Sequence, residues 1–377
     1  MKLLIGADIV PTTSNAELFT TGNAETLVGK GLLENLSSAD FRIFNLEVPL
    51  TDRFSPIDKC GPALMASTDT VAGYSALGID CLSLANNHIM DQGEQGLKST
   101  IDALKQKGIA FVGAGDSLSE ASASLIVEQD GKKIGIYACA EHEFSIAGEK
   151  TPGANPFDPL ESLDHIATLK AECDYVIVLY HGGKEHYRYP SPGLQKICRK
   201  IVEKGADLVV CQHSHCVGCE EKYHGGTIVY GQGNFLFDLS NSEFWNTSLL
   251  ITLDEDFRIS YVPLKKCNNM VRLASGEDAE KILSDFEKRS EEIKQEGFVE
   301  KQYKAYAENM LEQYLLAFSC IRRTFIYKVF DKLSGHKMTL WLLKKKYSKN
   351  KRLLLKNFIE CEAHRELVIE VMSLNDN

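Results

Sequence analysis

One stretch of the sequence decides the fold class: residues 81–88 read CLSLANNH. An apolar run of strand length ends here in two amides and an imidazole, so the polar side chains begin where the strand stops. Such side chains add nothing to a hydrophobic core, whereas ligands of open α/β sheets bind at the carboxyl ends of the strands. The stretch therefore predicts a buried strand that delivers polar groups to one edge of a sheet.

The same arrangement recurs along the first two-thirds of the chain. Apolar runs of strand length are directly followed by Asp8, by Glu47, by His181, and by the pair His213 and His215. A lone strand-end carboxylate is usually a helix cap or a turn residue, so the joint occurrence carries the inference. On an extended segment, the spacing in His213-Ser214-His215 directs both imidazoles to one side, which suits two neighbouring metal ions.

Strand-like runs alternate with helix-like stretches up to residue 268. Expected strands cover residues 2–5, 41–46, 81–85, 110–113, 124–128, 133–138, 175–180, 208–211, 227–231, 248–253 and 259–263. Expected helices include residues 93–107, 160–172 and 193–204. This alternation predicts an α/β sheet with many parallel pairings, covered by helices on its faces. Asp130-Gly131 and Asp254-Glu255-Asp256 between strand-like runs predict hairpins.

Charge and cysteine content restrict the function classes. The net charge is -10, but residues 301–377 carry +7, which leaves -17 on residues 1–300. An acidic body disfavours nucleic-acid binding and suits divalent cations. The 11 cysteines follow no disulfide framework, and Cys216-Val217-Gly218-Cys219 is a single C-x₂-C pair, so buried reduced thiols are expected. The short apolar run at the N-terminus and the absence of a long apolar segment predict a cytoplasmic protein with no transmembrane helix.

Several motifs occur in a fixed order between residues 3 and 240. They are Gly6-Ala7-Asp8, Asn45-Leu46-Glu47, Leu84-Ala85-Asn86-Asn87-His88 with Asp91-Gln92-Gly93, His181-Gly182-Gly183-Lys184-Glu185, Gln212-His213-Ser214-His215, and Gly233-Asn234-Phe235. On these motifs the chain resembles the CapA-type capsule and poly-γ-glutamate biosynthesis proteins, a branch of the calcineurin-like metallophosphoesterase superfamily. The resemblance implies a sandwich of two mixed β-sheets flanked by helices.

The resemblance also implies a role for each motif residue. Asp8 would bind a first metal ion together with His215, since Val10 stands where the wider superfamily has a histidine. Glu47 would bridge the two ions, and the second ion would be completed by Asn87, His181 and His213. His88 would be the catalytic proton donor, and Glu185 would lie behind the ligands or face the substrate. Imidazole, amide and carboxylate ligands suit Mn, Fe or Zn.

The C-terminal region has a different amino-acid composition. From a boundary near residues 268–275 the chain lacks proline and is rich in Glu, Lys, Leu and Ala, so residues 269–377 are expected to be helical and residues 1–268 to form the catalytic domain. Apolar residues recur at helical spacing in the segment 299–327, which predicts a docking stripe. The basic run Lys344–Lys356 is either a solvated helix face or a peripheral contact with an anionic membrane or polyanion.

Two functions of different classes follow from these observations. The first is a metal-dependent hydrolase with a dinuclear site, which cleaves a phosphoester or amide bond in capsule or poly-γ-glutamate metabolism. The second is a non-enzymatic accessory subunit of a polymer synthesis or export complex. A nucleotide phosphodiesterase is a third alternative. The expected partners are therefore an anionic polymer or phosphoester substrate, polymer-synthesis subunits, and no nucleic acid.

Overall fold

The structure is a computed structural model, and it describes residues 1–129, 131–319, 325–335 and 337–373. The chain divides into two compact units, Met1–Glu300 and Lys301–Asn377. The first unit contains every residue that the sequence analysis assigns to a site. The two units are therefore treated one after the other.

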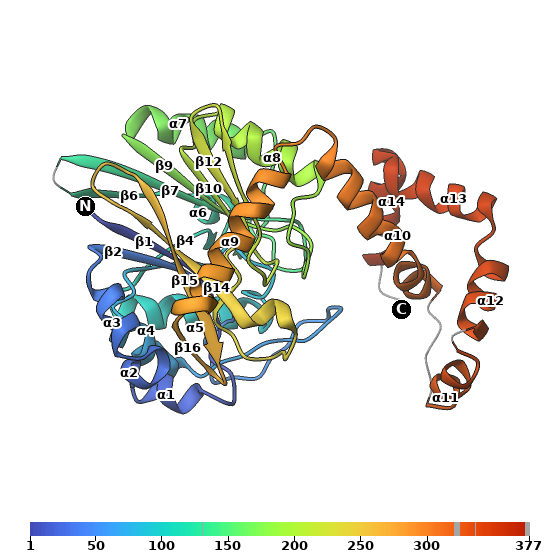
Figure 1. Cartoon of the computed structure of the whole chain (residues 1–377), viewed down its shortest axis with the longest axis horizontal. Helices are drawn as coiled ribbons and strands as arrows, with labels where there is room; N and C mark the ends of the chain where they lie inside the picture. Colours follow the sequence, from blue (N-terminus) through green and yellow to red (C-terminus); the bar gives the residue numbers. More distant parts are fainter. Residues whose placement is uncertain (130, 320–324, 336, 374–377) are drawn as a thin grey trace. The chain divides into compact units, whose positions relative to one another are not determined.

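Two mixed sheets form the centre of the first unit (Figure 1). The larger sheet has the strand order β16-β15-β14-β1-β2-β3-β4, with β13 also pairing with β1, and the smaller sheet has the order β11-β12-β10-β9-β7-β6. The short strands β5 and β8 pair with each other. The strands are β1 (Leu3–Ile9), β2 (Phe41–Leu46), β3 (Cys81–Ser83), β4 (Ala110–Val112), β5 (Ala114–Gly115), β6 (Leu125–Gln129), β7 (Lys132–Ala140), β8 (Gly153–Ala154), β9 (Tyr175–His181), β10 (Leu208–Gln212), β11 (Glu220–Tyr223), β12 (Gly226–Tyr230), β13 (Asn234–Leu236), β14 (Thr247–Leu253), β15 (Ile259–Cys267) and β16 (Met270–Leu273).

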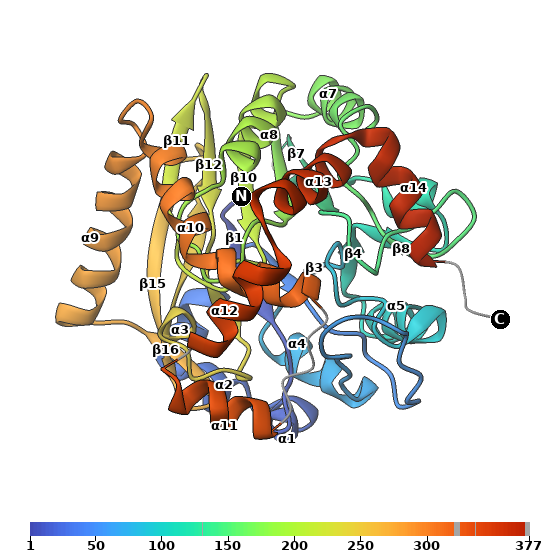
Figure 2. The same cartoon turned by 90° about the vertical axis from the view of Figure 1, so that its right-hand side faces the viewer.

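Helices cover both outer faces of the sheet pair, which gives four layers (Figure 1). α1 to α5 pack on the larger sheet, while α7 and α8 pack on the smaller one. Figure 2 shows α9 along the edge of the sheets, where it contacts β15 and β11. The helices are α1 (Ala16–Thr20), α2 (Ala24–Val28), α3 (Lys30–Ser37), α4 (Val71–Ala76), α5 (Gly93–Gln106), α6 (Leu118–Ala121), α7 (Ser162–Glu172), α8 (Pro192–Glu203), α9 (Gly276–Glu292) and α10 (Phe298–Ser319).

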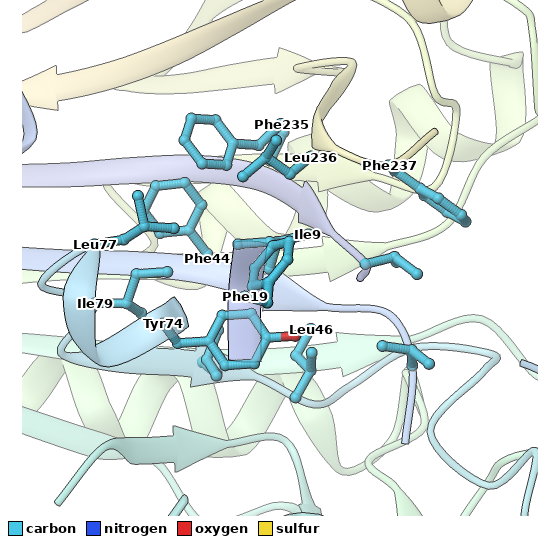
Figure 3. Packing of buried hydrophobic residues seen from close by; sticks show 14 of the residues in the cluster. Ile9, Phe19, Phe44, Leu46, Tyr74, Leu77, Ile79, Phe235, Leu236 and Phe237 are labelled. Carbon is cyan, nitrogen blue, oxygen red and sulfur yellow. The ribbon is translucent and has the colours of Figure 1, made fainter. Parts of the chain in front are cut away.

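Three apolar clusters hold these layers together, and strand alternation explains them. In β1, Leu3 and Ile5 face the smaller sheet, whereas Leu4 faces the helices on the opposite side. Figure 3 shows the helix-facing cluster, in which Phe19 of α1 and Tyr74 of α4 pack beneath the larger sheet. Because both faces of the central strands are buried, these strands are apolar throughout and polar residues can stand only at their ends.

The predicted architecture of two mixed sheets flanked by helices is confirmed, and the structure corrects it at two points. Residues 270–273 form β16 in a region expected to be helical, because they continue the antiparallel β14–β15 hairpin. The first compact unit extends to Glu300, past the boundary predicted at residue 268, since Ile282 and Phe286 of α9 are buried in the core between the sheets. Asp130 of the predicted β6–β7 turn, and residues 320–324 of the predicted helix 299–327, lie outside the described residues.

A bulge in β1 accounts for the one residue, Ala7, that separates Gly6 from Asp8. Ile5 pairs with Ile43 and Asp8 with Asn45, so β1 uses one residue more than β2 over this stretch. A bulge interrupts the ladder locally, and at this point the carbonyls of Ile5 and Gly6 accept hydrogen bonds from side chains. Two buried side chains supply them: Gln232 Nε2 donates to Ile5 O at 3.0 Å, and Gln212 Nε2 donates to Gly6 O at 3.1 Å.

The second unit continues from α10 with α11 (Phe325–Leu333), α12 (Lys337–Lys346), α13 (Lys349–Glu360) and α14 (Glu362–Ser373). Its buried apolar side chains, within the described residues, are Leu343 and Tyr347. Among the residues that the structure describes, none of the helices combines the length and the apolar character that a membrane crossing requires.

The bulge yields a stability prediction. A Cβ added at Gly6 would lie 1.9 Å from Cε1 of Phe44, a ring packed against Phe235. Gly6→Ala is therefore expected to lower the free energy of unfolding by about 1–3 kcal/mol, the usual cost of overpacking. Urea denaturation of the full chain measures the loss. Gly193→Ala is the matched control, because the nearest atom to its new Cβ is 3.7 Å away; equal midpoints for both variants would contradict the explanation.

Candidate metal centre

The carboxyl ends of the central strands of both sheets meet at one place in the first unit. Asp8 is the second-last residue of β1, Glu47 directly follows β2, and Asn87 lies beyond the end of β3. From the other sheet, His181 is the last residue of β9 and His213 directly follows β10. The structure thus brings together the strand ends that the sequence suggested would converge.

The first group of side chains surrounds Nε2 of His181, and we call it the His181 cluster. This atom lies 3.1 Å from Nδ1 of His213, 3.0 Å from Oδ1 of Asn87 and 3.5 Å from Oε1 of Glu47. Ligands about 2.0–2.1 Å from a tetrahedral ion are separated from one another by about 3.4 Å. The three distances from Nε2 of His181 therefore match the spacing of ligands around one small cation, and the candidate ligand atoms of Glu47, His181 and His213 all lie within 4.8 Å of one another.

The second group, which we call the His215 cluster, joins Glu47 to Asp8 and His215. Oδ2 of Asp8 lies 3.5 Å from Nδ1 of His215, and candidate ligand atoms of all three residues lie within 4.8 Å of one another. Nδ2 of Asn45 donates to Oδ1 of Asp8 at 2.8 Å, while Oδ1 of Asn234 lies 2.9 Å from Nδ1 of His215. Both ligands are thus oriented by a neighbouring amide.

Glu47 belongs to both clusters, and its environment is unusual for a carboxylate. The side chain is fully buried, and neither of its oxygens has a hydrogen-bond partner among the described residues. Burial raises the pKa of Glu47 to about 8, and the nearby Asp8 carboxylate acts in the same direction. An ionised carboxylate in such a place costs several kcal/mol unless a positive charge compensates it. The residues present therefore fit a bound cation on either side of Glu47.

The histidines of the His181 cluster are held in the form that binds metals. Burial lowers the pKa of His181 to about 4. Burial, followed by the neighbouring His181, also holds the pKa of His213 well below its ordinary value. His215 differs: burial favours its neutral form, but Glu47 and Asp8 outweigh burial and raise the pKa of His215 to about 9. The neutral imidazole is the metal ligand, so cation binding at His215 would displace a proton.

The backbone of residues 213–215 corrects one expectation. His213 and His215 have φ angles of 86° and 53°, so both residues adopt left-handed backbone conformations and the segment turns instead of being extended. The turns direct His213 to the His181 cluster and His215 to the His215 cluster. Such angles are strained for residues other than glycine and persist only where the surroundings enforce them. The segment is closely packed, because Gly231 lies so near it that a Cβ added to this glycine would be 2.6 Å from Oγ of Ser214.

His88 is half-buried and is held from one side by charged groups. Its Nδ1 lies 2.6 Å from Oδ2 of Asp91, a fully buried carboxylate. The ammonium group of Lys59, itself nearly inaccessible, contacts Oδ1 of Asp91 and lies 3.4 Å from Nδ1 of His88. The backbone N–H of Leu64 donates to the same carboxylate at 2.6 Å. The imidazole is therefore fixed through Nδ1, which leaves Nε2 available.

Glu185 is less constrained than the other predicted residues. It is exposed on the loop after β9, although it is close enough for its charge to interact with His213 and His215. Nearby, His186 has a φ of 58° and accepts a hydrogen bond from Nε1 of Trp245 at 2.8 Å. The Trp245 ring lies 4.8 Å from the His215 ring, so an aromatic wall borders this cluster.

Five residues at the site were assigned no role from the sequence, although three of them stand in the quoted motifs: Asn45, Lys59, Asp91, Asn234 and Trp245. A polar residue within an apolar strand marks Asn45, and the quoted motifs contain Asp91 and Asn234. Lys59 lies on an irregular segment with no pattern that identifies it.

The cysteines near the site are free and buried, as the sequence indicated. Cys211, Cys216 and Cys219 are all thiols, and burial raises the pKa of Cys216 to about 11. None of them belongs to the two candidate metal-binding groups found among the described residues. The C-x₂-C pair is therefore core packing around the His213–His215 turns.

Several proteins share sequence similarity with this chain. It is 32% identical over 213 residues to the capsule biosynthesis protein CapA of Bacillus anthracis, covering 54% of this chain and 52% of that protein. It is 31% identical over 206 residues to the PGA biosynthesis protein CapA of Bacillus subtilis, covering 53% and 54%. A probable polyglutamine synthesis accessory protein of Mycobacterium tuberculosis is 31% identical over 220 residues, covering 55% and 58%. The chain spans about half the length of these curated relatives.

The solved structures that are similar to this chain have lower sequence identity to it. A putative 5'-nucleotidase from Staphylococcus aureus has 14% identity and a TM-score of 0.43, with 76% of this chain and 57% of that chain covered. A phosphatase from Mycoplasma pneumoniae has 13% identity and a TM-score of 0.45, with coverage of 71% and 94%.

The match to a protein family is more direct, because it covers more than half of the chain. Residues 7–239 match the family described as "Bacterial capsule synthesis protein PGA_cap". That range includes every residue of the His181 and His215 clusters, together with His88 and Glu185. This chain therefore belongs to the PGA_cap family of bacterial capsule synthesis proteins.

Proposed function

We propose that this protein is a metal-dependent hydrolase with a dinuclear centre. The observation that carries the proposal is Glu47, a carboxylate without exposure or hydrogen-bond partners that is common to two groups of candidate ligands. In this proposal Glu47 bridges two divalent ions. Asp8 and His215 hold the first ion, and Asn87, His181 and His213 hold the second.

The ligand set favours particular metals and a particular chemistry. Imidazole nitrogens together with carboxylate and amide oxygens suit Mn, Fe or Zn better than Ca or Mg. Two such ions, when bound, supply a nucleophile at neutral pH and stabilise charge on the attacking and leaving oxygens. The protein fixes their spacing through Glu47 and orients the outer ligands through the amides of Asn45 and Asn234.

His88 is proposed as the general acid of this reaction. Its Nδ1 is engaged by Asp91, so Nε2 is the atom that would give a proton to the leaving group. Lys59 balances the charge of Asp91 and contacts the same ring nitrogen of His88. Glu185, which is exposed beside His213, is proposed to face the substrate.

The substrate is proposed to be a phosphoester or an amide of capsule or poly-γ-glutamate metabolism. The names of the Bacillus relatives, a capsule biosynthesis protein and a PGA biosynthesis protein, support this setting. The charge of -17 on residues 1–300 disfavours long nucleic acids as substrates.

An accessory role in polymer synthesis is the second candidate. The Mycobacterium tuberculosis relative is named a synthesis accessory protein, and a metal centre can order a binding surface without turnover. The two candidates differ in one respect that can be measured. Only the hydrolase predicts turnover of a phosphoester or a γ-glutamyl amide by the metal-loaded protein.

Metal content is the first test. Protein produced in medium supplied with Mn, Fe and Zn is expected to contain close to two ions per chain, and His213→Ala is expected to lose metal and hydrolysis together. Elemental analysis and a screen of phosphoesters and γ-glutamyl amides measure both. His224→Ala, at an exposed histidine, is the matched control. Metal without turnover of any substrate would favour the accessory role, whereas no bound metal would refute both forms of the proposal.

A second prediction concerns the bridging carboxylate. Glu47→Gln keeps the shape of the side chain but removes its charge, so metal affinity should fall more than about a hundredfold. Above about pH 8 the metal-free variant should nevertheless be at least as stable as the metal-free parent protein, because Glu47, whose pKa is raised to about 8, ionises there without a hydrogen-bond donor, whereas the amide stays neutral. Thermal unfolding with and without a chelator measures this. Glu34→Gln, an exposed site on α3, should change neither property; a destabilised metal-free Glu47→Gln would count against the assignment.

The role of His88 can be separated from metal binding. His88→Gln is expected to retain both ions. Its kcat should fall about 10²–10⁴-fold for esters with an alkoxide leaving group, which needs a proton. Esters with a nitrophenolate leaving group, which needs none, should be hydrolysed at nearly the parent rate. An equal loss for both classes of ester would show that His88 is not the acid.

A further inference from the structure

The second unit has an unusual surface. Seventeen of the twenty-four exposed large hydrophobic side chains among the described residues lie beyond residue 300. They occur on every helix of this part of the chain, and Leu333 and Met372 are about four-fifths exposed. So many exposed large apolar side chains in one short part of the chain indicate an interaction site rather than ordinary surface composition.

The same unit has a net positive charge, whereas the first unit has a net negative charge. Residues 332–359 contain nine Lys or Arg residues and no Asp or Glu. Of these nine, Lys356 alone has an ion pair within the described residues, with Glu360 at 3.1 Å. Lys346 donates to the backbone carbonyl of Ser319 at 2.8 Å, so its charge also has no acidic partner among the described residues. A run of basic residues that mostly lack acidic partners is complementary to an anionic surface.

Apolar and basic side chains are interleaved on α12 and α13, which we call the basic helices. On α13, Leu354 and Phe358 are four residues apart and share one face with Lys351, which lies three residues before Leu354, whereas Arg352 and Lys356 lie on the opposite face. On α12, the ammonium group of Lys345 lies 5.2 Å from the centre of the exposed Trp341 ring. Aromatic and aliphatic side chains bordered by lysines are the composition of helices that lie in a membrane interface.

We propose that the basic helices dock the protein on an anionic lipid surface, with Trp341, Leu354 and Phe358 inserted at the headgroup boundary. Lipid meets both requirements at once, because headgroups supply negative charge and acyl chains cover apolar side chains. A soluble polyanion would leave the apolar side chains uncovered. The chain's own acidic unit supplies charge, but it carries only seven of the twenty-four exposed large hydrophobic side chains of the described residues. The proposal is independent of the metal centre.

Vesicle binding tests the proposal with the full chain. The protein is expected to sediment with phosphatidylcholine vesicles that contain phosphatidylglycerol, less so as salt rises, and not with phosphatidylcholine alone. Each basic residue near such a surface strengthens binding about fivefold, so K344E/K345E/K346E should weaken it by at least about a hundredfold. K30E/K98E/K281E, which makes the same charge change at exposed lysines of the first unit, should bind as the parent protein does.

Trp341 reports insertion directly, because the only other tryptophan, Trp245, is buried. The fluorescence emission of Trp341 should shift to shorter wavelength when anionic vesicles are added. L354S/F358S should weaken vesicle binding, and circular dichroism should show that its secondary structure is unchanged. The proposal would be overturned if K344E/K345E/K346E bound anionic vesicles as tightly as the parent protein. It would also be overturned if the parent protein bound vesicles without a shift in Trp341 emission and L354S/F358S did not weaken that binding. A shift in Trp341 emission that accompanies dimer formation without lipid would overturn it as well. Equal affinity for soluble poly-γ-glutamate and anionic vesicles would also overturn it, in favour of a polyanion site.

Discussion

The site of this protein depends on one constraint: the carboxylate of Glu47 is removed from water and given no hydrogen-bond donor. Asp8 lies close by and adds a second negative charge, so electrostatic repulsion increases the cost of burial. The surrounding imidazoles remove this cost only in part: burial keeps His181 and His213 neutral through their lowered pKa values, and His215, whose pKa is raised to about 9, offers one positive charge to two carboxylates. Positive charge from outside the chain resolves the imbalance with the side chains where they are.

The sandwich holds these groups in place by joining its two sheets beside them. The bulge in β1 sets the position of Asp8, but it also interrupts the ladder with β2. Gln212 and Gln232 satisfy the freed carbonyls and thereby attach the ends of β10 and β12 to β1. Gln212 directly precedes His213, so the amide that repairs the bulge also anchors the turn that delivers two ligands. Loss of the hydrogen bond between Gln212 and Gly6 should therefore disturb the His181 cluster and the His215 cluster together.

Much of this arrangement could be predicted from the sequence, because burial on both faces forces the central strands to be apolar and leaves polar residues at their ends. Asp8, Glu47, His181 and His213 were found in this way. The positive φ angles of His213 and His215 could not be predicted, since no glycine marks these positions and the close packing of Ser214 against Gly231 arises from the tertiary fold. Lys59 was missed for a similar reason: it meets Asp91 through the tertiary fold, not through a local pattern. β16 was mistaken for helix because pairing with β15 overrides the composition of a four-residue segment.

The two units depart from a self-sufficient fold in opposite ways. The first unit buries charge that it does not neutralise, and the second exposes apolar surface that it does not cover. A large apolar side chain left in water forgoes about 1.5–3 kcal/mol of burial energy, and the second unit leaves many such side chains exposed around a core of Leu343 and Tyr347. Each deficit specifies its own complement: cations for the Glu47 site, and an apolar surface with negative charge for the basic helices. Because these complements differ in chemistry, the two units can be occupied and tested independently.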